Sequence, residues 1–203
     1  MATKSEGSPR ERLLAAANEL FYAEGVHTVG IDRVIERAGV AKASLYSTFG
    51  SKEELVREYL RARFARRQAL LLERIAQHAD PRAKILSVFD LLSELCAQPS
   101  YRGCAFMRAT AEAPEDAKSR TVCRDYRSWL TELFTTLARD AGARDPELLG
   151  SQLLTLHDGA TLGSTLDRDS DRGAVAKELA RTLLDSQTQR RASKGKRRAR
   201  DRE

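Results

Sequence analysis

Two short helical runs within residues 31–49 lie on either side of Gly39, and they constrain the fold more than any other feature of the chain. A helix, a tight turn containing glycine and a second helix together form the helix-turn-helix pattern. Val40, Leu45 and Phe49 are expected to face inward, where they pack the second run onto the helices before it. The outward positions of that run carry mostly small or polar side chains. So short a helix can lie in the major groove of DNA with base edges within reach.

The remainder of the sequence also follows helical spacing. Ala, Leu, Arg and Glu are plentiful and favour helices, whereas the alternation of Val, Ile and Thr that is typical of strands is nearly absent. Capping boxes at residues 8–11 and 51–54 mark the starts of two helices. Gly159 and Gly163 are four residues apart, a spacing that permits a close approach to another helix. We therefore expect an all-α protein of about nine helices, which span residues 9–24, 31–38, 42–49, 51–77, 80–97, 104–111, 115–141, 145–165 and 174–184.

The net charge of +6 is concentrated at the end of the chain. Residues 190–203 carry 8 basic and 2 acidic side chains, which equals the whole excess. Because residues 187–203 contain almost no apolar side chain, we expect a disordered basic tail there. This tail either adds non-specific affinity for DNA or only increases solubility, and the sequence favours neither interpretation. The N-terminus lacks the apolar core of a signal peptide and no run reaches 18 apolar residues, so the expected location is the cytoplasm.

The sequence offers no pattern typical of an enzyme or a metal site. It contains no phosphate-binding Gly-Lys-Ser/Thr loop, no Gly-x-Ser-x-Gly motif and no glycine-rich dinucleotide fingerprint. The histidines His27, His78 and His157 lie far apart, and Cys104 and Cys123 do not have the spacing of zinc ligands. We therefore expect neither catalytic activity nor a metal or other cofactor.

A set of short motifs follows in fixed order between residues 10 and 60. They are Ala-Ala-Asn-Glu-Leu-Phe, Glu24-Gly25, Ala38-Gly39-Val40, Lys42, Leu45-Tyr46, Phe49 and Ser51-Lys52-Glu53-Glu54-Leu55. In this order and spacing the motifs resemble the TetR family of bacterial transcription regulators. The resemblance implies a three-helix DNA-binding domain over residues 8–52, with its helix-turn-helix motif at about 31–50. It also implies a helical ligand-binding and dimerisation domain over residues 53–186, and a homodimer formed through the last two helices.

The resemblance also implies which residues contact DNA. In that family, residues matching Lys42, Tyr46 and Lys52 contact phosphates. The positions that would face base edges are Ala43, Ser44, Ser47 and Thr48, and Thr28 completes the set of expected DNA contacts. Two cap positions differ from the family pattern. Gly30 stands where the second helix often has Ser or Thr, and Ala41 stands where the recognition helix often has Ser.

The region that the resemblance assigns to ligand binding contains several aromatic residues. The candidate pocket residues are Phe89, Phe106, Met107, Tyr126, Trp129 and His157. As a group they indicate a mainly apolar pocket with few polar anchors. The expected function is therefore a bacterial transcriptional regulator, most often a repressor, that a small molecule of apolar character releases from a palindromic operator.

Cys104 supports an alternative switch. It follows Arg102-Gly103 at an expected junction between a loop and a helix, where the guanidinium and the helix N-terminus would favour the reactive thiolate. The alternative function is a regulator that senses oxidants or electrophiles through Cys104. The same residue is also consistent with a small buried side chain of no special reactivity.

Overall fold

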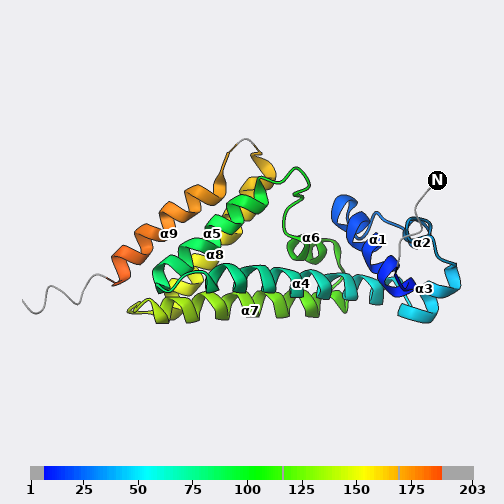
Figure 1. The fold of residues 1–203 in the computed structure, drawn as a ribbon, viewed down its shortest axis with the longest axis horizontal. Coiled ribbons are helices and arrows are strands. Elements are labelled where there is room, and N and C mark those ends of the chain that lie inside the picture. The colour runs from blue at the N-terminus through cyan, green and yellow to red at the C-terminus, as the bar shows by residue number, and fades with distance from the viewer. Residues whose placement is uncertain (1–6, 116, 169, 189–203) are drawn as a thin grey trace, which may run out of the picture. The chain divides into compact units, whose positions relative to one another are not determined.

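The computed structural model describes residues 7–115, 117–168 and 170–188, and these residues form nine α-helices and no strand (Figure 1). The helices are α1 (Pro9–Glu24), α2 (Ile31–Ala38), α3 (Lys42–Phe49), α4 (Lys52–Ala76), α5 (Pro81–Cys96), α6 (Ala105–Glu112), α7 (Ser119–Asp140), α8 (Pro146–Leu166) and α9 (Arg172–Thr188). The expected all-α fold is confirmed. None of these described helices has both the length and the apolar composition that a bilayer span requires.

Side chains just ahead of several helices fix where those helices begin. The Ser8 hydroxyl accepts a hydrogen bond from the Glu11 amide at 3.3 Å, and the Glu11 carboxylate accepts one from the Ser8 amide at 2.8 Å. The carboxylates of Asp80 and Asp145 cap α5 and α8 in the same way. These bonds satisfy backbone donors that have no partner inside a helix.

Two helix boundaries differ from the sequence-based expectation. α7 begins at Ser119 rather than near residue 115, because the Arg120 guanidinium donates hydrogen bonds to the carbonyl oxygens of Ala113 and Pro114 and holds that segment as a loop. α9 runs over Arg172–Thr188 rather than 174–184. Residues 187 and 188 of the expected tail are therefore helical, and residues 189–203 lie outside the described part of the chain.

The chain divides into two compact units. The head unit contains residues up to 68 together with residues 104–127, and the body unit contains residues 69–103 and those from 128 onward. The expected domain boundary near residue 52 thus falls inside the head unit, because α6 and the start of α7 pack with the first four helices. For example, the Arg108 guanidinium donates to the Tyr22 carbonyl at 2.7 Å, and the Lys118 amide donates to Glu53 at 2.9 Å.

Each unit has its own apolar core. In the head unit, the fully buried side chains of Leu13, Val34 and Leu45 hold α1, α2 and α3 together, and Phe21 packs edge-on against Tyr59 of α4 with ring centroids 5.5 Å apart. Burial of each such side chain contributes about 1.5–3 kcal/mol. The core therefore fixes the position of α3 against its neighbours.

In the body unit, α5, α8 and α9 pack against one another around buried side chains that include Phe89 and Leu153. Close approach occurs at Gly150 and Gly173. A Cβ atom on Gly150 would lie 2.9 Å from the Thr135 backbone, and one on Gly173 would lie 2.7 Å from the Cα atom of Ser93. Of the two glycines that the sequence spacing singles out on α8, Gly163 faces α9, where a Cβ atom would lie 3.2 Å from the Arg172 side chain, whereas a Cβ atom on Gly159 would have no neighbour within 4 Å in the single chain.

Candidate nucleic-acid interface

The turn between α2 and α3 has a backbone conformation that favours glycine. Gly39 ends α2 in the left-handed region, with φ 62° and ψ 41°, where side chains with a Cβ atom are disfavoured. The Arg12 guanidinium donates a hydrogen bond to the Gly39 carbonyl at 3.1 Å, which ties α1 to this turn. Leu45 is fully buried and Phe49 nearly so. α3 is therefore held at a fixed angle and presents one face to solvent.

The solvent face of α3 contains most of the residues that the sequence assigned to DNA contact. Lys42, Ala43, Tyr46, Ser47 and Thr48 are exposed, whereas Ser44 is half-buried. Tyr46 is 47 % exposed, so its ring is open to solvent. The helix thus offers an aromatic ring, a cation and small hydroxyl side chains within two turns.

The hydroxyl groups on this face are already oriented. Both Ser47 and Thr48 donate hydrogen bonds to the Ser44 carbonyl, at 3.2 and 2.6 Å. Each hydroxyl oxygen keeps lone pairs that can accept hydrogen bonds from base amino groups. Thr28 lies in the exposed loop between α1 and α2, outside this helix.

Ion pairs restrain the charged groups around α3. Lys42 pairs with Asp32 of α2 at 2.9 Å, and this hydrogen bond raises the pKa of the lysine. Both side chains are largely exposed, so the pair contributes little stability and a phosphate can take the place of Asp32. Arg33 and Arg37 of α2 form bidentate pairs with Glu24 and Glu19 of α1. The arginines of α2 therefore join helices together.

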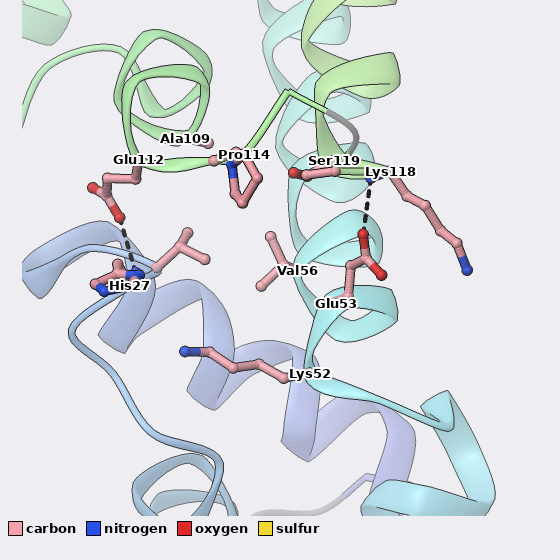
Figure 2. Close-up of a pocket in the computed structure, with 12 residues that line it drawn as sticks. His27, Lys52, Glu53, Val56, Ala109, Glu112, Pro114, Lys118 and Ser119 are labelled. Atoms are coloured by element: carbon pink, nitrogen blue, oxygen red, sulfur yellow. Dashed lines mark hydrogen bonds between the residues drawn. The ribbon is translucent and has the colours of Figure 1, made fainter.

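Lys52 occupies a different environment from the α3 residues. It lies in the first turn of α4, is half-buried, and lines a pocket within the head unit together with His27 and Glu112 (Figure 2). Burial lowers the pKa of its ammonium group, although the nearby Glu112 carboxylate opposes this change. Nothing in the sequence pattern indicated this pocket, which is built from segments far apart in the chain.

The aromatic residues expected to form a ligand pocket fall into two clusters. In the head unit, Phe106 stacks on Tyr126 with ring centroids 3.9 Å apart, and Phe64 meets both rings edge-on. In the body unit, Phe134 packs against Phe89 and His157 at 6.1 and 6.0 Å.

The other two candidates are less buried than these rings. Met107 is 40 % exposed, and Trp129 is half-buried. The assignment of all these residues to one pocket stays a prediction.

Cys104 stands at the N-cap of α6, which is the expected junction between a loop and a helix, and it is half-buried. A second thiol, Cys123 of α7, is buried nearby in the same unit, and burial raises its pKa. Neither residue is in a disulfide. Within the described residues, no three His, Cys, Asp or Glu side chains gather closely enough to hold a metal ion.

Comparison with known proteins places these features among bacterial regulators. Residues 13–59 match the family described as "Bacterial regulatory proteins, tetR family". The solved structure of the TetR transcriptional regulator sav143 from Streptomyces avermitilis is 32 % identical, covering 89 % of this chain and 98 % of that one, with a TM-score of 0.81. SCO4454, a TetR-family regulator from Streptomyces coelicolor, is 29 % identical over 89 % and 96 % of the chains, with a TM-score of 0.85. The transcriptional repressor NemR of Escherichia coli is 28 % identical, covering 76 % of this chain and 71 % of NemR.

Proposed function

Because the chain belongs to the tetR family of bacterial regulatory proteins, we propose that it represses its target genes by binding an operator, and that a small molecule releases it. The observation that carries this proposal is the face of α3, whose small polar side chains are exposed while Leu45 and Phe49 hold the helix in place. All the relatives named above are transcriptional regulators, and NemR is named as a repressor. The proposed location is the bacterial cytoplasm.

In the proposed complex, α3 of each subunit lies in a major groove. Ala43, Ser44, Ser47 and Thr48 face base edges. Phosphates are bound by Lys42, Tyr46 and Lys52, with Thr28 at the margin of the interface. Two subunits related by a two-fold axis require a palindromic operator, with half-sites roughly 34–36 Å apart or a multiple of that distance.

The proposed homodimer forms through α8 and α9. Four apolar side chains of these helices are half or more exposed in the single chain: Leu162, Leu166, Val175 and Leu179. Large apolar side chains gathered on one pair of helices are typical of an interface with another protein. A second copy of the chain would cover them and would also bring two α3 helices to one operator.

The proposed effector binds among the aromatic side chains of α5 to α8. The candidates remain Phe89, Phe106, Met107, Tyr126, Trp129 and His157, and the two clusters that some of them form support an effector of apolar character. Such a molecule releases the operator only if it binds the DNA-incompetent conformation more tightly. A coupling free energy of about 1–3 kcal/mol between the two sites is typical.

Fluorescence anisotropy with a labelled DNA fragment from the promoter beside the protein's own gene tests this function. We expect the dimer to bind at nanomolar concentrations and Tyr46→Ala to weaken binding at least tenfold. The change Lys84→Met serves as a control, because Lys84 lies on α5 in the body unit. Failure of the dimer to bind any fragment of the flanking DNA would contradict the proposal.

A second candidate function is a thiol switch at Cys104, favoured by its half-buried position at the N-cap of α6. The thiolate would add to a quinone so that sulfur bonds to a ring carbon. One oxygen takes up a proton from solvent, the other receives the proton lost from the attacked carbon, and the ring becomes a substituted hydroquinone. We expect benzoquinone to release operator DNA from the wild type and from Cys96→Ser but not from Cys104→Ser. Full release in Cys104→Ser would eliminate this candidate.

A further inference from the structure

The head unit contains a pocket of about 580 Å³ beside the start of α4 (Figure 2). Its walls come from the α1–α2 loop, the first two turns of α4, and the segment from α6 to the start of α7. Most of the wall is apolar, and the contributing side chains are Val26, Val56, Ala109, Ala113, Pro114 and Ala117. The volume and the apolar lining are those of a pocket for a small organic molecule.

The acidic groups that line this pocket already have partners. The Glu112 carboxylate accepts a hydrogen bond from the His27 backbone amide at 2.9 Å, and the Glu53 carboxylate accepts one from the Lys118 amide at 2.9 Å (Figure 2). The Lys118 ammonium pairs with Glu54 at 3.1 Å. These bonds brace the wall of the pocket and give both lining carboxylates a donor from the wall itself.

Lys52 is the exception among the charged residues of this wall. Its half-buried ammonium group makes no hydrogen bond or ion pair with any residue that the structure describes, and the burial lowers its pKa. As the first residue of α4, it also lies at the positive end of the helix dipole, which disfavours a cation. An ammonium group in this position gains most from a negative charge placed next to it.

We propose that this pocket binds a small organic monocarboxylate, with the carboxylate against Lys52 and its apolar body against Val26, Val56 and Pro114. A charge-assisted hydrogen bond to a partly buried lysine is stronger than one in open solvent. The apolar walls select a molecule with a hydrocarbon body over inorganic anions, which would leave those walls in contact with water.

One consequence rests on the proposed repressor function. Lys52 is also an expected phosphate contact, so a carboxylate in the pocket and an operator phosphate compete for the same ammonium group. Binding of either ligand then weakens the other by the same factor, as thermodynamic linkage requires. The pocket would thus act on the DNA-binding head directly, separately from the aromatic clusters proposed for the effector.

Methyl NMR of the full-length protein with ¹³C-labelled valines tests the site without DNA. The probes are 4-phenylbutyrate and octanoate, each compared with its alcohol of equal length. We expect both carboxylates to shift the methyl signals of Val26 and Val56, and not those of Val88 in the body unit, while the alcohols bind at least tenfold more weakly. The proposal is overturned if neither carboxylate shifts the two pocket valines, or if acids and alcohols bind equally.

Three variants distinguish binding in the pocket from a general effect of substitution on the fold. Lys52→Met removes the charge and should weaken carboxylate binding at least tenfold. The control is Lys84→Met, which removes a half-buried lysine of α5 and should leave carboxylate binding unchanged. Ala113→Leu fills the pocket from its wall and should weaken acids and alcohols alike. Circular dichroism checks that each variant is folded. Wild-type affinity in Lys52→Met would refute the assignment of the anion to this lysine.

Operator binding measured with and without the probes distinguishes this inference from the proposed function. Competition predicts that saturating 4-phenylbutyrate lowers operator affinity in the wild type and has little effect in Lys52→Met. If the protein binds no operator but the valine signals still shift, the repressor proposal fails and the pocket stands. If it binds an operator that bound probe leaves unaffected, the competition is refuted.

Discussion

Ala41 stands at the N-cap of α3 with an extended backbone, φ −71° and ψ 148°, and offers no side-chain acceptor to the first amides of the helix. A serine there would supply one, so Ala41→Ser should raise the free energy of unfolding by about 1 kcal/mol. For a chain of this size that corresponds to roughly 2–4 °C in the midpoint of a thermal melt. Gly30→Ser, at the uncapped start of α2, should gain only a few tenths of a kcal/mol, since glycine caps nearly as well. An unchanged midpoint in Ala41→Ser would argue against the cap.

In the proposed complex, Lys42 exchanges one exposed partner for another, because its ion pair with Asp32 gives way to a phosphate. Lys42→Met removes one phosphate contact from each of the two subunits, so it should make the slope of log K against log salt shallower by about 1.8 while sequence preference is retained. The matched change Asp32→Asn removes the competing carboxylate and should strengthen binding. Titrations at several salt concentrations measure both effects, and an unaltered slope in Lys42→Met would exclude this lysine as a phosphate contact.

Tyr59 gives the head unit a dependence on alkaline pH. Burial against Phe21 raises the pKa of its phenol to about 12, although Arg63 and Arg108 lower it in part. Since the unfolded chain has a phenol pKa of about 10, the unfolded state loses its proton first as the pH rises. The stabilisation is complete below about pH 10 and is lost between about pH 10 and 12. Urea denaturation across this range should show a flatter pH dependence in Tyr59→Phe than in the wild type.

At the scale of the helices, two glycines of the body unit should respond oppositely to alanine. A Cβ atom on Gly173 would overlap the backbone of Ser93, so Gly173→Ala should cost about 1–3 kcal/mol. Gly159 lies exposed within α8 with open space around it in the single chain, so Gly159→Ala should gain about 0.5–1 kcal/mol from helix propensity when it is measured in a variant that does not dimerise. Urea denaturation compares the two, and equal stability in both variants would contradict the close packing of α9 on α5.

The start of a helix could be predicted from the sequence where the capping residue stands directly before the helix that it caps. Ser8, Asp80 and Asp145 each bind an amide three residues ahead, so the start of α1, α5 or α8 depends on adjacent residues alone. The start of α7 escaped prediction because Arg120 reaches back six and seven residues to hold a loop. The spacing of Gly159 and Gly163 has a similar limit, since it does not say which of the two glycines faces another helix of the chain, and in the structure it is Gly163 that faces α9.

The same distinction between local and long-range signals applies to the two candidate sites. The face of α3 is a local pattern, so the exposure of Tyr46 and the burial of Leu45 follow from helical spacing. The pocket around Lys52 combines Val26 and His27 of the α1–α2 loop with residues from 109–114 and 117–119, which lie more than eighty positions further along the chain. Only tertiary packing brings these segments together, and the sequence pattern of neither segment indicates that it contacts the other.

At the scale of the whole molecule, the distribution of charge determines how the protein can bind DNA. Residues 1–60 carry 8 basic and 9 acidic side chains, and several of those arginines are engaged between helices, as with Arg33 and Glu24. Over these residues, which contain α1 to α3, bulk positive charge therefore contributes little to DNA binding. Affinity must come from a few placed donors and, above all, from two heads binding one operator together, which multiplies their weak individual contributions.

The proposed dimerisation through α8 and α9 can be tested directly. Leu179 of α9 is 50 % exposed, so Leu179→Glu should leave the chain folded while placing a charge in the apolar interface. We expect this variant to elute as a monomer in size-exclusion chromatography with light scattering and to lose operator affinity at least a hundredfold. Leu72→Glu is the matched control, since Leu72 is similarly exposed, at 47 %, but lies on α4. A Leu179→Glu variant that stays dimeric and keeps full operator affinity would show that the interface does not lie on these helices.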